Sequence, residues 1–209
     1  MRLVQYWHSA TPPEEVAALI ESWRRDPQLE HALFDREAAA DFILHRYGAR
    51  HRAAFDRCAV PAMQADFFRY CHLHAVGGAY VDADTENGGG LPALVGNASV
   101  GMLMRRHGNV ANDFLFVREP GHPLFAEVIA RAVENIEAAR SNNVWEVTGP
   151  GIMTGLYNRS EAADLFAPFT FVPVEEVRRV VMFRWDLAYK SGQEDWRVAL
   201  GGGASIYRD

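Results

Sequence analysis

Short apolar runs alternate with amphipathic stretches from the first residues onward. Leu3 to Trp7 is predicted to be a short buried strand. The run Thr11-Pro12-Pro13-Glu14-Glu15 is typical of a helix start, with a capping hydroxyl, prolines and acidic residues in the first turn. That helix should continue to about Arg24, because Asp26-Pro27 would break it. Leu29 to Phe34 is a second short strand candidate.

The same alternation continues through the rest of the chain. Helices are expected over Asp35 to Tyr47, Ala49 to Arg57, Ala62 to Val76 and Pro123 to Ala139. Strands are expected over Ala79 to Asp82, Ser99 to Met104, Asp113 to Val117 and Phe169 to Val172. Strands alternating with helices predict an α/β fold, a mixed and mostly parallel sheet flanked by helices, in a single domain over residues 1–209. Residues 197–209, with three consecutive glycines, suggest a flexible tail or a loop that closes over a ligand.

Composition narrows the class of protein. The chain has 209 residues, of which 49% are hydrophobic and 23% charged, as in an ordinary folded domain. Its net charge of -6 disfavours nucleic acid and anionic lipid as partners, because both are bound mainly by basic surfaces. Cys58 and Cys71 are too few for a disulfide framework. We find no signal peptide or transmembrane segment and expect a cytoplasmic protein, one that would visit a membrane only peripherally, at its inner face.

Two carboxylates mark the densest cluster of polar residues. Asp82 and Asp84 follow an apolar strand at positions i and i+2, so alternation would send both side chains to one side. Such a pair suits Mn²⁺ or Mg²⁺, which take one or two carboxylates and complete their shell with water and phosphate oxygens. An acidic, solvated turn explains the same residues equally well. A calcium loop fits less well, because Asn87 stands where that loop needs glycine and Ala93 where it needs glutamate.

A zinc site formed by Cys71, His72 and His74 is the other metal alternative. On a helix only residues three or four apart share a face, so His72 would point away from the other two. We favour Cys71 as a core residue and the two histidines as ordinary ones.

Asp66 and Arg69 lie three residues apart on the same predicted helix. They could form a surface ion pair of a few tenths of a kcal/mol. The surrounding residues are mostly apolar, which instead places the pair at the edge of the core or in a cleft. There a carboxylate and a guanidinium can hold several hydroxyls of a sugar.

The run from Ala62 to Asp84 combines D-x-x-R-Y, paired glycines, a tyrosine and D-x-D. This run resembles the signature of the DXD-containing glycosyltransferase family 32, which is related to the clostridial glucosylating toxins. Leu3 to Trp7, Asn112-Asp113 and Thr148-Gly149-Pro150 are similar to further segments of that family. The resemblance implies a GT-A type, Rossmann-like domain. It also implies retaining transfer of a hexose from a nucleotide diphosphate sugar, a UDP- or GDP-sugar, with Mn²⁺ or Mg²⁺ as cofactor.

The resemblance also implies roles for individual residues in the metal and donor sites. Asp84 would bind the metal directly, Asp82 would contact ribose or the metal through water, and Asp66 and Arg69 would hold the donor sugar. Tyr80 would line the ribose pocket, Trp7 would stack on the base, and Asn112 would face the sugar. For Trp7 and Tyr80, a role as ordinary core aromatics is an open alternative.

The family pattern is altered near the C-terminus. The family usually has a His followed by Ser-Trp there, whereas this chain has Tyr189-Lys190-Ser191-Gly192-Gln193-Glu194-Asp195-Trp196. Trp196 fits the donor site, Asp195 could supply an oxygen to the metal, and Lys190 could pair with phosphate as a point charge.

We therefore expect a metal-dependent retaining glycosyltransferase of bacterial surface polysaccharide synthesis, with a saccharide or glycolipid acceptor. One alternative is a degenerate protein that binds a nucleotide sugar and transfers it poorly, as the altered C-terminal motif suggests. A metal-dependent phosphoester hydrolase is the other, because paired aspartates also permit that chemistry.

Overall fold

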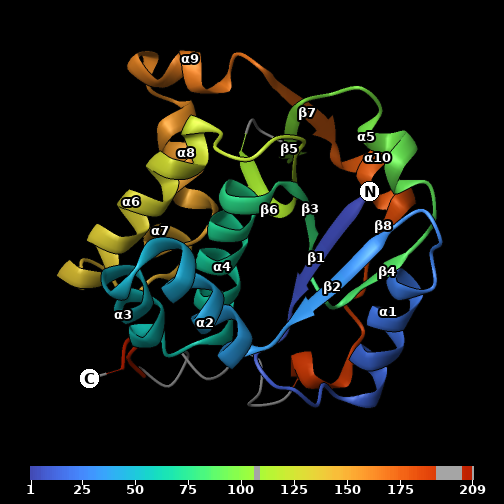
Figure 1. Cartoon of the computed structure of the whole chain (residues 1–209), viewed down its shortest axis with the longest axis horizontal. Coiled ribbons are helices and arrows are strands. Elements are labelled where there is room, and N and C mark those ends of the chain that lie inside the picture. The colour runs from blue at the N-terminus through green and yellow to red at the C-terminus, as the bar shows by residue number, and fades with distance from the viewer. Residues whose placement is uncertain (106–108, 192–203, 209) are drawn as a thin grey trace.

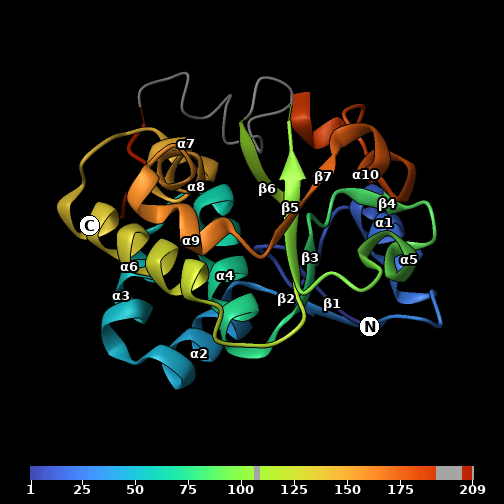
Figure 2. The ribbon, with the colours of Figure 1, turned by 90° about the horizontal axis from the view of Figure 1, so that it is seen from above.

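A computed structural model describes residues 1–105, 109–191 and 204–208. A six-stranded sheet crosses the molecule, with helices on both faces (Figures 1 and 2). Its strands, in spatial order, are β2 (Glu30–Phe34), β1 (Arg2–Tyr6), β3 (Gly78–Val81), β6 (Val110–Val117), β5 (Val100–Met104) and β7 (Phe169–Pro173). Only β6 in this sheet runs antiparallel to its neighbours. The predicted mixed, mostly parallel sheet flanked by helices is confirmed.

The helices fall into two groups. One face of the sheet packs against α2 (Arg36–Tyr47), α3 (Ala49–Arg57), α4 (Pro61–Val76), α6 (Pro123–Ala138), α7 (Val144–Val147), α8 (Pro150–Tyr157) and α9 (Ala163–Phe166). The other face packs against α1 (Glu14–Arg24), α5 (Leu91–Val95) and α10 (Val174–Val180). The longer helices follow their predicted bounds to within about a turn, because proline, glycine and capping residues mark their ends.

Helix α4 lies at the centre of the larger core. Ten of its sixteen residues are buried, from Met63 to Leu73. Apolar side chains account for most of this burial, yet Asp66 and Arg69 are buried among them. The helix ends at Gly77, and Gly77 and Gly78 both adopt positive φ, at 76° and 99°. A Cβ at Gly77 would also lie 3.1 Å from two backbone oxygens, so glycine is required where the chain turns from α4 into β3.

The sequence patterns did not predict several short strands and helices. Strands β4 (Thr85–Asn87) and β8 (Val181–Phe183) pair as a separate antiparallel ribbon. This ribbon, together with α5 and α10, fills the face of the sheet on which α1 lies. Strand β6 begins three residues earlier than predicted, at Val110. Elements of three to five residues are too short for their periodicity to be recognised.

Part of the C-terminal segment is described. In the stretch 197–209, expected to form a tail or closing loop, residues 204–208 lie against α3 and the 141–142 region. Ile206 is fully buried, and Tyr207 pairs with Cys58 in an isolated bridge. Residues 197–203 and 209 lie outside the described ranges.

Trp23 of α1 fixes the ribbon that follows the two aspartates. Its buried indole N–H donates to the Thr85 carbonyl at 2.9 Å. We predict that Trp23→Phe lowers the free energy of unfolding by about 1–3 kcal/mol, because a buried acceptor loses its donor. Urea unfolding measures this change. The control Trp185→Phe, at a tryptophan that is 58% exposed, should change stability by less than about 0.5 kcal/mol. Equal effects of both variants would contradict the anchoring role of Trp23.

Candidate functional site

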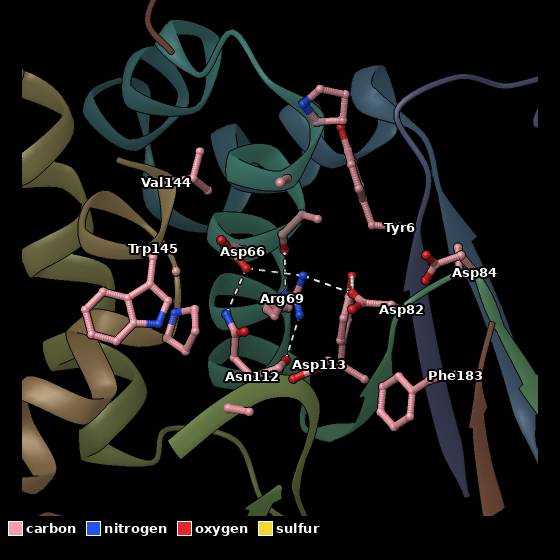
Figure 3. A pocket seen from close by; sticks show the side chains of 18 of the residues that line it. Tyr6, Asp66, Arg69, Asp82, Asp84, Asn112, Asp113, Val144, Trp145 and Phe183 are labelled. Atoms are coloured by element: carbon pink, nitrogen blue, oxygen red, sulfur yellow. Dashed lines mark hydrogen bonds and ion pairs between the residues drawn. The ribbon is translucent and has the colours of Figure 1, made fainter. Parts of the chain in front are cut away.

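The main cleft opens where β1 and β3 separate. These parallel strands pair only at Leu3 with Ala79 and at Val4 with Tyr80. From β1 the chain crosses one face of the sheet to β2, and from β2 it returns over the other face to β3. Ligands of α/β sheets bind at such a switch point, beyond the carboxyl ends of the strands. A cleft of about 580 Å³ lies there, with Trp7 and Asp82 in its wall (Figure 3).

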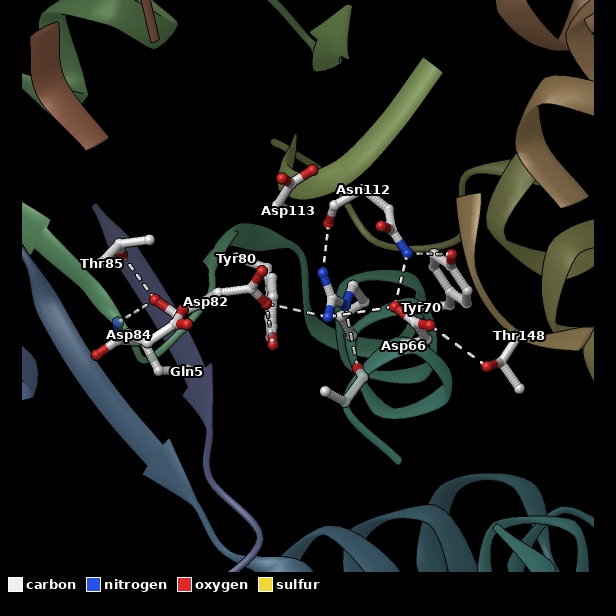
Figure 4. A network of polar contacts seen from close by, with 12 residues as sticks. Gln5, Asp66, Tyr70, Tyr80, Asp82, Asp84, Thr85, Asn112, Asp113 and Thr148 are labelled. Carbon is white, nitrogen blue, oxygen red and sulfur yellow. Dashed lines mark hydrogen bonds and ion pairs between the residues drawn. The ribbon is translucent and has the colours of Figure 1, made fainter. Parts of the chain in front are cut away.

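Arg69 lies in the wall of this cleft, between two carboxylates. Its guanidinium Nη2 is 3.2 Å from Asp66 Oδ1 and 3.0 Å from Asp82 Oδ1. Its Nη1 donates to the Asn112 carbonyl at 2.6 Å, and its Nε donates to the carbonyl of Ala65 (Figure 4). The predicted Asp66–Arg69 pair therefore exists, and it is buried in a cleft rather than exposed on the surface.

Two side chains besides Arg69 donate hydrogen bonds to the Asp66 carboxylate. Asn112 Nδ2 donates to its Oδ1 at 2.8 Å, and Thr148 Oγ1 donates to its Oδ2 at 3.3 Å. The Asn112 amide also donates to the Tyr70 hydroxyl at 2.6 Å. Helix α4, strand β6 and the segment after α7 thus meet at one carboxylate (Figure 4).

Burial and charge set the protonation of these groups. Burial raises the pKa of Asp66, while the Arg69 charge and the hydrogen bonds from Asn112 and Thr148 oppose the shift. Burial also raises the pKa of Asp82 to about 7; Arg69 opposes that rise and the neighbouring Asp84 adds to it. Burial works against the charge of Arg69, but Asp82, Tyr80 and Asp66 together outweigh it, so the pKa of the guanidinium is raised. Arg69 is therefore a fixed positive charge in the wall of the cleft.

Tyr80 lies beneath Arg69. Its ring centroid is 4.3 Å from the Arg69 guanidinium carbon, and its hydroxyl donates to Asp82 Oδ1 at 3.1 Å. The ring is fully buried, and its contacts hold the side chains of Arg69 and Asp82 in position. Its predicted contact with ribose stays a prediction.

The two aspartates reach the cleft by a turn rather than by strand alternation. Strand β3 ends at Val81, so the predicted alternation beyond that residue is wrong. The Asp82 carbonyl accepts from the Thr85 hydroxyl at 2.6 Å and from Gln5 Nε2 at 3.2 Å. This turn directs Asp82 toward Arg69, and Asp84 lies beyond Asp82, farther from Arg69 (Figures 3 and 4).

Asp84 is held by the segment near the C-terminus. Lys190, the only lysine of the chain, places Nζ 2.6 Å from Asp84 Oδ2. The Tyr189 hydroxyl donates to the same oxygen at 2.6 Å. Glu15 of α1 accepts from the backbone N–H groups of Ala188 and Tyr189, at 3.1 and 3.3 Å, which fixes the 188–191 turn over the cleft.

Trp7 lies in the cleft wall beside this turn. Its ring meets the Tyr189 ring edge to face, with centroids 5.4 Å apart.

Asp195 and Trp196, expected in the metal and donor sites, lie outside the described residues. Trp145 and Trp185 also line the cleft and were not singled out from the sequence, because exposure of a ring to a cleft depends on tertiary packing.

The residues present fit a divalent cation only in part. Asp82 and Asp84 are hard oxygen donors at a cleft where substrate phosphates could complete the shell. Each already faces a basic side chain, Arg69 or Lys190. Among the described residues, no three His, Cys, Asp or Glu side chains form a metal-binding group. A cation at Asp84 would therefore have to displace Lys190 and depend on further oxygens from the substrate.

The zinc alternative has no structural support. Cys71 is fully buried in the core, and His72 stacks on Phe42 with ring centroids 5.2 Å apart. His74 Nδ1 lies 2.8 Å from the Tyr47 hydroxyl. These three side chains pack in different surroundings.

Comparison with known proteins shows a family resemblance over part of the chain. Residues 13–98 match the model of the glycosyltransferase sugar-binding region containing the DXD motif. This part of the chain is similar to the sugar-binding region of DXD glycosyltransferases. The matched region contains α4, Asp82 and Asp84, but it ends before Asn112, Thr148 and Lys190.

Two yeast proteins resemble this chain beyond that region. An initiation-specific alpha-1,6-mannosyltransferase of Schizosaccharomyces pombe is 25% identical over 181 residues, or 71% of this chain. A putative glycosyltransferase, HOC1, of Saccharomyces cerevisiae is 21% identical over 182 residues, or 72% of this chain. The chain spans 46% of the length of each relative.

A solved structure resembles the fold. The PaToxG glycosyltransferase superposes with a TM-score of 0.57 at 16% sequence identity, covering all of this chain and 88% of that one. At this identity the likeness concerns the GT-A-like fold.

Arg69→Ala should unfold the site. The variant leaves Asp66 and Asp82 without their shared cation, so we predict a loss of about 3–5 kcal/mol in the free energy of unfolding. Arg50→Ala, which breaks the exposed Arg50–Glu137 pair, is the matched control and should change the free energy of unfolding far less than Arg69→Ala does, because solvent screens an exposed pair. Chemical denaturation of both variants measures the difference. A small loss for Arg69→Ala would show that the buried network contributes little to stability.

Lys190→Met should strengthen divalent cation binding. Lys190 competes for Asp84, so its removal should lower the Kd for Mn²⁺ by about fivefold, the equivalent of about 1 kcal/mol. Titration of the protein with Mn²⁺, followed by electron paramagnetic resonance of the free ion, measures this constant. Lys190→Arg keeps the charge and should behave like the wild type. Weaker Mn²⁺ binding by Lys190→Met would mean that the ammonium does not compete with the metal.

Proposed function

We propose that this chain is a metal-dependent retaining glycosyltransferase that moves a hexose from a nucleotide diphosphate sugar to a hydroxyl of a saccharide or glycolipid. The proposal rests chiefly on one observation: the buried Asp66–Arg69–Asp82 network and Asp84 of the DXD motif line a single cleft. Burying several charges costs free energy, so a buried ion network contributes little to stability by itself. A network of this kind that reaches a cleft is typical of a binding site.

The charges suggest where each part of the donor would bind. The Asp66 carboxylate and the side-chain oxygen of Asn112 would accept hydrogen bonds from hydroxyls of the hexose, because both amide N–H groups of Asn112 already donate within the network. The diphosphate would lie near Asp82 and Asp84, where Lys190 can pair with its oxygens. Trp7, beside Tyr189 in the cleft wall, is the candidate to stack on the base.

A divalent cation bound by Asp84 and Asp82 would neutralise the charge that develops on the leaving diphosphate. In the proposed transfer, the acceptor hydroxyl oxygen forms a bond to the anomeric carbon, and the bond from that carbon to the diphosphate oxygen breaks. The proton of the hydroxyl passes to the departing diphosphate, and a nucleoside diphosphate and a new glycoside are released. The fixed charge of Arg69 keeps Asp66 and Asp82 in place during this exchange, because both carboxylates are paired to it.

The proposal extends to the donor, the biological role and the cellular location of the protein. The S. pombe relative is named as an alpha-1,6-mannosyltransferase, which makes GDP-linked and UDP-linked hexoses the donors to test first. The role in bacterial surface polysaccharide synthesis rests on the sequence resemblance, since both named relatives are yeast proteins. In the described part of the chain, no helix has the length and apolarity needed to span a bilayer. We propose action in the cytoplasm, with peripheral contact to the inner membrane face when the acceptor is a glycolipid.

One contact favours the second candidate, a protein that binds a nucleotide sugar without transferring it. Lys190 and Tyr189 already occupy an oxygen of Asp84, which could weaken a catalytic metal site. Turnover of the donor separates the two candidates.

Asp84→Asn tests the proposal. We predict loss of Mn²⁺-dependent donor binding and a fall of about 100-fold or more in nucleoside diphosphate release, since the metal contributes several kcal/mol to such reactions. Stability should change by less than about 1 kcal/mol, because the pair lost with Lys190 is only partly buried. The assay follows nucleoside diphosphate release from UDP- and GDP-hexoses with Mn²⁺ or with a chelator.

Asp41→Asn removes an exposed carboxylate on α2, 59% exposed, and serves as the control with wild-type turnover. Full activity of Asp84→Asn would refute the proposed metal role. Donor binding without turnover in the wild type would instead favour the second candidate.

A further inference from the structure

Trp145 is an exposed aromatic residue in the wall of the cleft. Its side chain is 45% exposed, although large apolar side chains in this fold are mostly buried. It extends from the short helix α7 into the cleft that contains Asp66 and Asp84. In Figure 3 Trp145 lies across the cleft from Asp84, with Asp66 and Arg69 between them.

The indole ring is held in place by glycines. A Cβ at Gly151 would lie 2.4 Å from the Trp145 carbonyl oxygen, 2.6 Å from its ring atom Cε3 and 2.8 Å from Cζ3, closer than any side chain allows. A Cβ at Gly149 would lie 2.8 Å from the Trp145 Cα. The benzene edge of the ring therefore rests directly on the backbone of α8. A ring fixed in this way can offer an open surface to a ligand with little loss of side-chain entropy.

The segment that carries Trp145 is bonded to the proposed hexose site. Thr148, three residues beyond Trp145, donates to Asp66 Oδ2 at 3.3 Å. Asn143 accepts from the Trp145 backbone N–H at 3.0 Å and begins the helix. These contacts fix the position of the ring relative to the carboxylate that would hold the donor sugar. A molecule lying on Trp145 would be next to that sugar.

The chemistry of this end of the cleft favours a neutral sugar. The other lining residues contributed by α7, α8 and the start of α4 are apolar: Pro61, Ala62, Ala65, Val144 and Pro150. The charged residues that suit a diphosphate, Asp84 and Lys190, lie at the opposite side. A pyranose has an apolar face of C–H groups that packs on an indole ring, while its hydroxyls face water or polar neighbours.

We propose that Trp145 is the platform for the acceptor saccharide. This inference rests on the proposed function and adds the position of the acceptor to it. The ring packs against one face of the acceptor sugar and presents an acceptor hydroxyl to the donor hexose at Asp66. Trp145 is then a binding residue that acts on the acceptor and leaves the nucleotide site unchanged.

The direct test is saccharide binding in the absence of any donor. The chain has five tryptophans, so its ¹⁵N-labelled form gives five indole N–H resonances, and Trp145→Phe identifies the one from Trp145. The probes are the methyl α-glycosides of mannose, glucose and galactose, together with α-linked mannobiose. We expect at least one probe to shift the Trp145 resonance in a saturable way. If none of the probes shifts it, or if UDP or GDP shifts it instead, the proposal is overturned.

Glycine variants provide a matched pair for this titration. Gly151→Ala should displace the ring and raise the Kd for the probe by about tenfold, whereas Gly155→Ala, four residues further on α8, meets no atom within 4 Å and should bind as the wild type does. Equal probe affinity in both variants would overturn the platform role.

Kinetics separate this inference from the proposed function. Trp145→Ala should raise the acceptor KM by about tenfold and leave the donor KM within about twofold, while Trp145→Phe should recover part of the loss. Leu44→Ala, which removes an apolar side chain of similar exposure (40%) on α2, should leave both constants unchanged.

A rise in the donor KM of Trp145→Ala would assign the ring to the donor and overturn the inference while the proposed function stands. A wild type that releases no nucleoside diphosphate from any donor would refute the proposed function, and the donor-free titration would still decide the role of Trp145.

Discussion

The site depends on one buried cation, Arg69, shared by two carboxylates. Asp66 comes from the same helix and Asp82 from the turn after β3, so the guanidinium ties the helix to the carboxyl edge of the sheet. It also donates to the β6 backbone, at the Asn112 carbonyl. Because a buried charge without a partner is far more costly than a paired one, these three elements must keep their relative positions. The cleft is therefore largely formed before any ligand binds.

Around this centre the cleft has two chemically distinct sides. The side formed by the DXD turn and the 188–191 turn carries the carboxylate of Asp84 and the ammonium of Lys190. The side formed by α7 and the start of α4 is apolar and carries Trp145. A charged diphosphate and a neutral sugar would thus be separated within one cleft, with the reacting carbon between them near Asp66. The order of groups along the cleft matches the order of groups in a transfer reaction.

The parts of this arrangement that sequence could predict are those set locally. The i, i+3 spacing of Asp66 and Arg69, the paired glycines and the D-x-D spacing follow from residues close in sequence, as do the main helices and strands. The contacts of Asn112 with Asp66 and of Tyr189 with Asp84 join residues 46 and 105 positions apart, and only folding brings them together. Trp145 lies close in sequence to the glycines that it contacts, but the exposure of its ring to the cleft depends on how α7 packs in the folded chain. The strand alternation assumed for Asp82 and Asp84 was wrong because a turn begins after Val81.

We propose that this cleft binds a nucleotide diphosphate sugar with the help of a divalent cation. Thermal unfolding of the wild-type chain with UDP- and GDP-hexoses, each with and without Mn²⁺, tests this directly, because a ligand of the native state raises Tm by mass action. We expect Tm to rise with one nucleotide class, and only when Mn²⁺ is present. An unchanged Tm with every donor, in protein shown to be folded, would contradict it.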